Sequence, residues 1–467
     1  MIHRLKILSV VVTTLLVGSC TMIPKLPKID AAIPKNFPSA GLVKTKGPMA
    51  SAIPWRDYFV DAQLRGVISL ALTNNRDLRI AALNIEKARA QYQIQSADLF
   101  PSISGGLGQS TLRLPNNSIT GMHKVIKREF TATLDLTSYE IDFFGRIRSL
   151  KAQAFQNYLS TEEAKRSAQI SLIAEVANAW LKLAADNERL MLAQKTHQTR
   201  QKAFELIRSS FKIGLASEID LRQAETLMEG SRADAARYTA LALQDKNALT
   251  LLVGTSIPED LLPAKLSNKL NAVDEIPAGV SSEVLTRRPD ILQAERTLAA
   301  ANAYIGAARA AFFPRITITV SGGVGSTSLE NLFESDSSTW KFMPQLRIPI
   351  FEGGKLRANL KVAEVQRDIN VAVYEKAIQR AFREVADALA ERASIKERLD
   401  ARRNLVKASG KTFRLTEARY AEGIDNYFIV IDSERTFYAA QLDLISVHFD
   451  DASNRVILYK VLGGGVR

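Results

Sequence analysis

The chain has 467 residues, of which 46% are hydrophobic and 24% are charged, and its formal net charge is +13. This composition is typical of a folded protein and excludes a low-complexity or disordered chain. The basic residues are spread along helical stretches beside acidic neighbours and form no cluster with aromatic residues, so nucleic acid is not an expected partner. The chain has a single cysteine, Cys20, which excludes an intrachain disulfide.

The N-terminus has the pattern of an export signal. Arg4 and Lys6 precede an apolar run over residues 7–17, which is too short to span a bilayer. The sequence after this run ends at Cys20 and resembles a bacterial lipobox. We therefore expect residues 1–19 to be a signal peptide and Cys20 to carry a covalent lipid. An ordinary signal peptide with an incidental cysteine is the alternative.

Composition changes along the chain predict four further parts. Residues 20–56 are rich in proline and without periodicity, and are expected to form an extended tether after the lipidated cysteine. A first structural repeat is expected over 57–254, a proline-containing linker over 255–283, and a second structural repeat over 284–467.

Alternation with a period of two predicts one β-hairpin in each repeat. In the first hairpin, over about 102–143, apolar and polar residues alternate most clearly at 131–136. In the second, over about 315–351, the expected strands flank a Gly- and Ser-rich connection, 322–339, and the last strand is expected to reach Ile350. Each strand would have one apolar and one polar face, and the chain would have four strands.

Long helices are predicted over 146–253 and 354–462. No Gly or Pro occurs between Arg146 and Ile213, which allows a single helix of about 100 Å. Its expected buried seam consists of apolar residues at steps of three and four, interrupted by Asn187: Ile173, Ala177, Trp180, Ala184 and Met191. Helices of this length exceed what a compact domain uses, so they are expected to form a bundle or tube.

Matching motifs show that the chain is internally duplicated. The Phe-Pro pairs that begin at Phe100 and Phe313 lie 213 residues apart. The Gly-Arg pair at Gly145 and the Gly-Lys pair at Gly354 lie 209 residues apart. A repeat of this length is too long for a solenoid unit, and it predicts that one chain fills two equivalent places in a ring.

Four strands with one apolar face also predict how many chains assemble. A sheet in lipid must close, because an open edge leaves backbone groups without partners. The smallest membrane barrel has about eight strands, so one chain cannot close alone. Two, three or four chains would give eight, twelve or sixteen strands around a polar lumen. The expected fold is therefore mainly α with a β-barrel part.

The segment over residues 280–314, which contains Arg287-Arg288-Pro289-Asp290, strongly resembles the outer-membrane efflux factors. These are TolC-like proteins, and the resemblance is to their lipoprotein branch, which serves RND multidrug pumps. Residues 55–64, 144–146, 214–217 and 423–432 share the resemblance. It implies a homotrimer whose twelve-stranded outer-membrane β-barrel continues into a periplasmic α-barrel of about 100 Å.

This resemblance also implies a function and a location. The protein would be the exit duct of a tripartite efflux system, exporting small molecules such as drugs. Its partners would be a periplasmic adaptor protein, an inner-membrane RND pump and outer-membrane lipid. It would be lipid-anchored in the outer membrane and extend into the periplasm.

Two turns at the ends of the long helices are the expected contacts with the adaptor. They occupy equivalent places in the two repeats. Their residues are Gly214, Leu215, Ala216, Ser217, Gly423, Ile424, Asp425 and Asn426. Glycine at a helix end and Ser or Asn before the next helix are also ordinary capping residues. The assignment to the adaptor rests on the resemblance.

A periplasmic gate is expected just after the second turn. Phe428, Asp432 and Arg435 are spaced i, i+4 and i+7, which places them on one helix face. The resemblance implies an apolar ring, an acidic ring and a basic partner that locks neighbouring helices. On an unrelated helix the same residues would be one apolar side chain and a local ion pair. The first repeat has Gln223 and Thr226 in place of the charged pair, so the gate would differ between repeats.

No pattern of catalytic or metal-ligating residues accompanies the few histidines, so no enzyme activity and no cofactor besides the lipid are expected. Two other functions stay open. One is the exit duct of a type I protein secretion system. The other is a structural coiled-coil lipoprotein without a pore, which accounts for the helices but not for the duplicated strands.

Overall fold

A computed structural model describes residues 21–26, 29, 33–34, 37, 50–113, 126–267 and 282–465. Cys20, the expected signal peptide and most of the expected tether lie outside these residues.

The chain forms two compact units. Unit 1 consists of Met1–Asp30, Asn84–Thr161 and Gln293–Tyr374, and unit 2 of Ala31–Leu83, Glu162–Leu292 and Glu375–Arg467. The units do not coincide with the two sequence repeats, since each unit takes segments from both.

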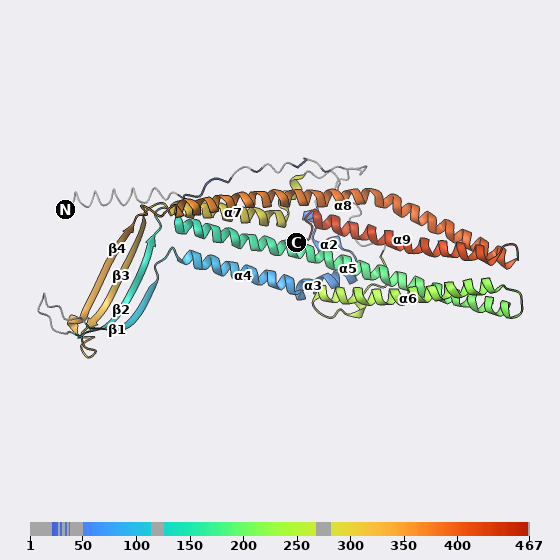
Figure 1. Cartoon of the computed structure of the whole chain (residues 1–467), viewed down its shortest axis with the longest axis horizontal. Helices are drawn as coiled ribbons and strands as arrows, with labels where there is room; N and C mark the ends of the chain where they lie inside the picture. The colour runs from blue at the N-terminus through green and yellow to red at the C-terminus, as the bar shows by residue number, and fades with distance from the viewer. Residues whose placement is uncertain are drawn as a thin grey trace. The chain divides into compact units, whose positions relative to one another are not determined.

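The described residues are mainly helical (Figure 1). The α-helices are α2 (Trp55–Tyr58), α3 (Ala62–Asn74), α4 (Arg76–Ala97), α5 (Arg146–Lys212), α6 (Glu218–Val253), α7 (Pro289–Ala310), α8 (Lys355–Ala421) and α9 (Tyr427–Val461). The strands are β1 (Ile103–Arg113), β2 (Ile126–Ile141), β3 (Arg315–Ser326) and β4 (Ser338–Arg347). Short 3-10 helices are η1 (Ala50–Ala52), η2 (Glu259–Leu261), η3 (Ser282–Arg287) and η4 (Ser335–Ser337). None of the described helices is both long and apolar enough to cross a bilayer.

The duplication is visible in the lengths of equivalent helices. Helices α4 and α7 both have 22 residues, and their first residues, Arg76 and Pro289, lie 213 positions apart. Helices α5 and α8 both have 67 residues, and Arg146 and Lys355 lie 209 positions apart. The offset changes between these two pairs, so the length difference between the repeats falls in the segment that contains the strands.

In unit 1 the four strands form one antiparallel sheet in the order β1-β2-β3-β4 (Figure 1). The register places Leu134 of β2 opposite Gly322 of β3, which in turn lies opposite Trp340 of β4. The next row contains Thr133, Gly323 and Thr339. Side chains alternate between faces, so one face is apolar and the other polar, as the sequence predicts. Leu134 and Trp340 are 66% and 83% exposed, so the apolar face is uncovered within a single chain.

The second hairpin differs from its prediction at both ends. Strand β3 continues to Ser326 through residues that were expected to form the connection. Glycine fits there because a Cβ at Gly323 would lie 2.1 Å from the carbonyl oxygen of Ala132. Strand β4 ends at Arg347 and does not include Ile350. Arg347 pairs with Arg315, and the residue before Arg315 is a proline, which has no N–H to extend the ladder.

The core of unit 2 forms along α5 and includes most of the predicted seam. Ile173, Ala177, Trp180 and Ala184 are buried, and the Trp180 indole donates a hydrogen bond of 3.0 Å to the carbonyl of Leu261. The prediction for Met191 is wrong. Met191 is 46% exposed whereas Ala193 is fully buried, so the buried face of α5 shifts around the helix along this part of its length.

The Arg-Arg-Pro-Asp segment has a structural role in unit 2. Arg288 is buried and donates to the carboxylates of Asp290 and Glu384, each at 2.8 Å. It also donates to the carbonyl of Val461 at 3.0 Å. One guanidinium therefore joins the first turn of α7 to α8 and to the last residue of α9.

Candidate functional site

The two predicted turns have the same backbone geometry, and both lie in unit 2. Gly214 and Gly423 have positive φ angles of +75° and +72°. In each turn the following N–H reaches back to the helix: Leu215 to the carbonyl of Ser210, and Ile424 to that of Arg419, both at 2.9 Å. This is the hydrogen bond of a helix that ends in a left-handed glycine.

In the first turn, Ser217 begins α6 with a capping box. Its hydroxyl accepts from the Asp220 N–H at 3.1 Å, and the Asp220 carboxylate accepts from the Ser217 N–H at 3.2 Å. Leu215 at this turn is 79% exposed. The polar groups of this turn are therefore satisfied locally, and its apolar side chain is free to contact a partner.

The second turn is held by an ion pair instead. The Arg419 guanidinium donates to both oxygens of Asp425, at 2.6 and 2.9 Å, and these hydrogen bonds lower the pKa of Asp425 below its ordinary value. The Asn426 side chain accepts from the N–H of Ile429 and caps α9. Ile424 is 61% exposed. Both turns thus present one large exposed apolar residue at the same place.

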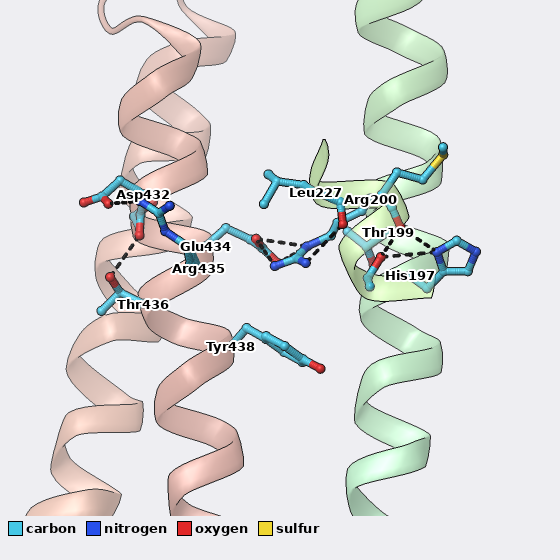
Figure 2. Close-up of polar contacts among 12 residues, drawn as sticks. His197, Thr199, Arg200, Leu227, Asp432, Glu434, Arg435, Thr436 and Tyr438 are labelled. Atoms are coloured by element: carbon cyan, nitrogen blue, oxygen red, sulfur yellow. Dashed lines mark hydrogen bonds and ion pairs between the residues drawn. The ribbon is translucent and has the colours of Figure 1, made fainter. Parts of the chain in front are cut away.

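The predicted gate residues all lie on the exposed side of α9. Phe428 is 54% exposed, and the Arg435 guanidinium donates to the Asp432 carboxylate at 2.8 Å. The side chains of Arg435 and Asp432 are 62% and 59% exposed. Figure 2 shows this pair within one helix, with the Thr436 hydroxyl bonded to the Asp432 carbonyl. The charged pair is therefore local to α9, and among the described residues it joins no second helix.

A second ion pair lies close to the predicted gate residues and is buried. Arg200 of α5 donates to both carboxylate oxygens of Glu434, with a shortest distance of 2.8 Å, and to the carbonyl of Leu227 of α6 at 3.2 Å (Figure 2). The Arg200 and Glu434 side chains are only 9% and 16% exposed. The pair therefore connects the hairpin α5–α6 to the hairpin α8–α9.

Aromatic contacts reinforce this connection. The Arg200 guanidinium lies over the ring of Tyr438, 5.2 Å from its centroid, and the Tyr438 hydroxyl is 3.3 Å from the carboxylate of Asp234. Sequence reasoning missed Arg200, because 234 positions separate it from Glu434 and no local pattern relates the two.

These residues can bind and position helices, and they show no arrangement for bond-breaking chemistry. The described residues contain no group of three His, Cys, Asp or Glu side chains able to hold a metal ion. His197 instead contacts the carbonyl of Met228 at 3.3 Å and the hydroxyl of Ser231 at 3.2 Å (Figure 2).

Comparison with known families identifies the architecture. A family model described as "Outer membrane efflux protein" matches residues 67–255 and 280–464, one match in each repeat.

Named relatives match along nearly the whole chain. The probable efflux pump outer membrane protein TtgC of Pseudomonas putida is 44% identical over 463 residues, covering 98% of this chain and 95% of the relative. The outer membrane protein OprJ of Pseudomonas aeruginosa is 38% identical over 457 residues, with coverage of 98% and 95%. The crystal structure of the open state of the Neisseria gonorrhoeae MtrE outer membrane channel is 38% identical, with a TM-score of 0.87 and coverage of 96% and 99%.

Proposed function

The chain belongs to the outer membrane efflux protein family and is the outer-membrane component of an efflux pump, and we propose that three copies form one exit duct. In this trimer the sheet of each chain supplies one third of a twelve-stranded barrel. The long helices of the three chains form a tube in the periplasm.

The observation that carries the proposal is the four-stranded sheet. Within the described residues the outer edges of β1 and β4 have no strand partner, and the apolar face is uncovered. Both features cost free energy in water, and an unpaired edge also costs several kcal/mol per backbone group in lipid. Pairing β1 of one chain with β4 of the next satisfies the edges, turns the apolar face to lipid and encloses the polar face.

The two turns are the proposed docking points for a periplasmic adaptor protein, which would connect the duct to an inner-membrane RND pump. Leu215 and Ile424 support this role because each is a large apolar residue exposed at a turn whose glycine is held by hydrogen bonds to the preceding helix. A trimer would offer six such turns.

Phe428, Asp432 and Arg435 are the proposed gate. Three copies of the exposed face of α9 around one axis would stack an apolar ring next to an acidic ring. Three Asp432 carboxylates would attract cations and repel anions, because like charges in a narrow pore focus the field. In the trimer Arg435 could exchange its local partner for a group on the neighbouring chain.

Cys20 is the proposed site of lipidation, which would anchor the mature chain in the outer membrane. One acyl chain alone binds a membrane reversibly, whereas the barrel holds the protein permanently. The lipid would therefore assist targeting and orientation more than retention.

A pair of charge substitutions on adjacent strand positions tests the duct. Leu134→Arg places a charge on the apolar face, which costs about 2–4 kcal/mol near the middle of a bilayer. We expect loss of trimers from outer-membrane fractions and loss of drug resistance in a deletion strain. Thr133→Arg is the matched control on the polar face, and it should assemble while altering single-channel conductance in planar bilayers. Equal tolerance of both variants, or a purified protein that stays a monomer without conductance, would refute the proposal.

A further inference from the structure

A cavity of about 290 Å³ lies between the two hairpins of unit 2, close to the turns. All four long helices contribute to it: Ala203 and Leu206 from α5, Ala224 and Leu227 from α6, Phe413 and Tyr420 from α8, and Tyr427 and Val430 from α9. Most of the lining is apolar, and small-molecule sites are typically apolar cavities of this size or larger with a few polar groups.

The polar groups of the cavity are of two kinds. Arg200 and Glu434 line it as the buried ion pair already described, and each satisfies the charge of the other. Glu417 of α8 also lines it and forms no ion pair within the described part of the chain. The Glu417 side chain is exposed to solvent, so it adds a hydrated negative charge at the open edge of the cavity.

Two tyrosines add an aromatic surface. The rings of Tyr420 and Tyr427 lie 5.3 Å apart, and neither hydroxyl is bonded to another described residue. Burial raises the pKa of Tyr427 to about 12, and Tyr420, Glu434 and Asp220 act in the same direction against Arg200. The two rings thus form a poorly hydrated aromatic surface, and such a surface favours a positively charged ligand.

We propose that this cavity binds amphipathic organic cations, with the apolar part of the ligand among the leucines and alanines and its cationic group between Glu417 and the tyrosine rings. Aromatic faces attract cations through the ring quadrupole, and a carboxylate adds a direct charge interaction. A ligand here contacts both hairpins, so its binding would hold them in the arrangement described. This inference goes beyond the exit-duct function and does not require that the trimer conducts.

The test uses the full-length lipidated protein in nanodiscs, because detergent could itself occupy an apolar cavity. Benzyltrimethylammonium is the probe and benzenesulfonate, with a similar ring and the opposite charge, is its control. Isothermal titration calorimetry should give saturable binding of the cation, and affinity for the anion should be at least about tenfold weaker.

Three variants assign the binding to this cavity. Glu417→Gln should weaken cation binding by about fivefold, since it removes the charge at little structural cost. Ala203→Leu should fill the cavity and abolish binding. Glu422→Gln changes an exposed carboxylate on the turn after α8, outside the cavity lining, and should leave affinity unchanged.

Absence of saturable cation binding would overturn the proposal, as would equal binding of the anion or full affinity in Glu417→Gln. Should Ala203→Leu fail to assemble, the Glu417→Gln and Glu422→Gln pair still decides the question. Conductance measured on the same preparations reports separately on the exit duct.

Discussion

The hairpins α5–α6 and α8–α9 share the geometry of their turns and differ in the side chains they expose. Each ends its first helix at a glycine with positive φ, and each begins its second helix with a polar cap, Ser217 or Asn426. The charged pair Asp432–Arg435 has only Gln223 and Thr226 as equivalents in the first repeat. The two repeats thus kept similar helix lengths and the same kinds of helix cap, while the exposed side chains of the hairpins diverged.

The two hairpins also differ at a buried position. Asp245 of α6 is equivalent to Asn454 of α9, 209 positions later. The Asn454 amide donates to the carbonyl of Ala388 at 2.9 Å, whereas the Asp245 carboxylate accepts from the Lys182 ammonium at 2.5 Å. The first hairpin is therefore held by a charge and the second by a neutral hydrogen bond at the same place.

The largest effect is expected from breaking the buried contact between the hairpins. Arg200→Met leaves the Glu434 carboxylate buried without a partner and should lower the free energy of local opening of α9 by about 3 kcal/mol. Native-state hydrogen exchange of α9 measures this quantity. Arg435→Met, which breaks an exposed pair on the same helix, should change it by less than about 0.5 kcal/mol. Equal effects of the two variants would contradict the distinction between the buried and the exposed pair.

The gate proposal predicts a functional difference between the hairpins. Asp432→Ala combined with Arg435→Ala removes the acidic ring and its basic partner, so single-channel conductance should rise about tenfold and cation preference should fall. The equivalent pair of changes in the first repeat, Gln223→Ala with Thr226→Ala, should leave both unchanged. If the Asp432→Ala, Arg435→Ala variant keeps its conductance and its cation preference, these residues do not form a gate.

Because the two turns have the same backbone geometry, we expect equal losses of stability when their equivalent glycines are substituted. A Cβ at Gly214 or Gly423 would meet no atom within 4 Å, so alanine is disfavoured there only by the left-handed backbone. Gly214→Ala and Gly423→Ala should each destabilise their hairpin by about 1 kcal/mol, as measured by hydrogen exchange of the adjoining helix ends. Unequal losses of stability in the two variants would contradict the equivalence of the two turns.

The smallest effect is a pH dependence at the buried Asp245 carboxylate of the first hairpin. Burial and the neighbouring Asp186 carboxylate raise the pKa of Asp245, against the opposing influence of Lys182. A folded-state pKa above the unfolded one means that stability is lost as the pH rises through the folded value. Asp245→Asn, which copies the second repeat, should therefore raise the melting temperature by about 2 °C at pH 8 and by less at pH 4.

The control for this prediction is Asp443→Asn, which changes a carboxylate of α9 that is 51% exposed. This carboxylate pairs with Arg402 at 2.9 Å, so the substitution should not raise the melting temperature at either pH value. A larger gain for Asp245→Asn at pH 4 than at pH 8 would reverse the assigned direction of the pKa.

Local patterns in the sequence predicted much of the fold. The absence of Gly and Pro after Arg146 predicted a helix of the length of α5, and the strand alternation predicted the two faces of the sheet. Strand ends were harder to predict, because they depend on pairing with a distant strand. Gly323 belongs to β3 because it pairs with Thr133 of β2 and Thr339 of β4.

Only part of the candidate site could be predicted from the sequence. Its turns could be located because Gly214 and Gly423 end helices through their own backbone preference. The gate residues were selected by family resemblance, and the structure adds that Asp432 and Arg435 pair with each other within one chain. The cavity and Glu417 were not anticipated, because its walls come from four helices that are far apart in the sequence.

By itself, the sequence determined the duplication, the helix lengths, the alternating strands and the family, since each depends on residues that are near one another or at a constant offset. Only the tertiary structure decided that Arg200 meets Glu434, that Met191 is exposed and that a cavity separates the hairpins. These features depend on which helix faces pack together, and the free energy of such contacts comes from burial and pairing between distant segments.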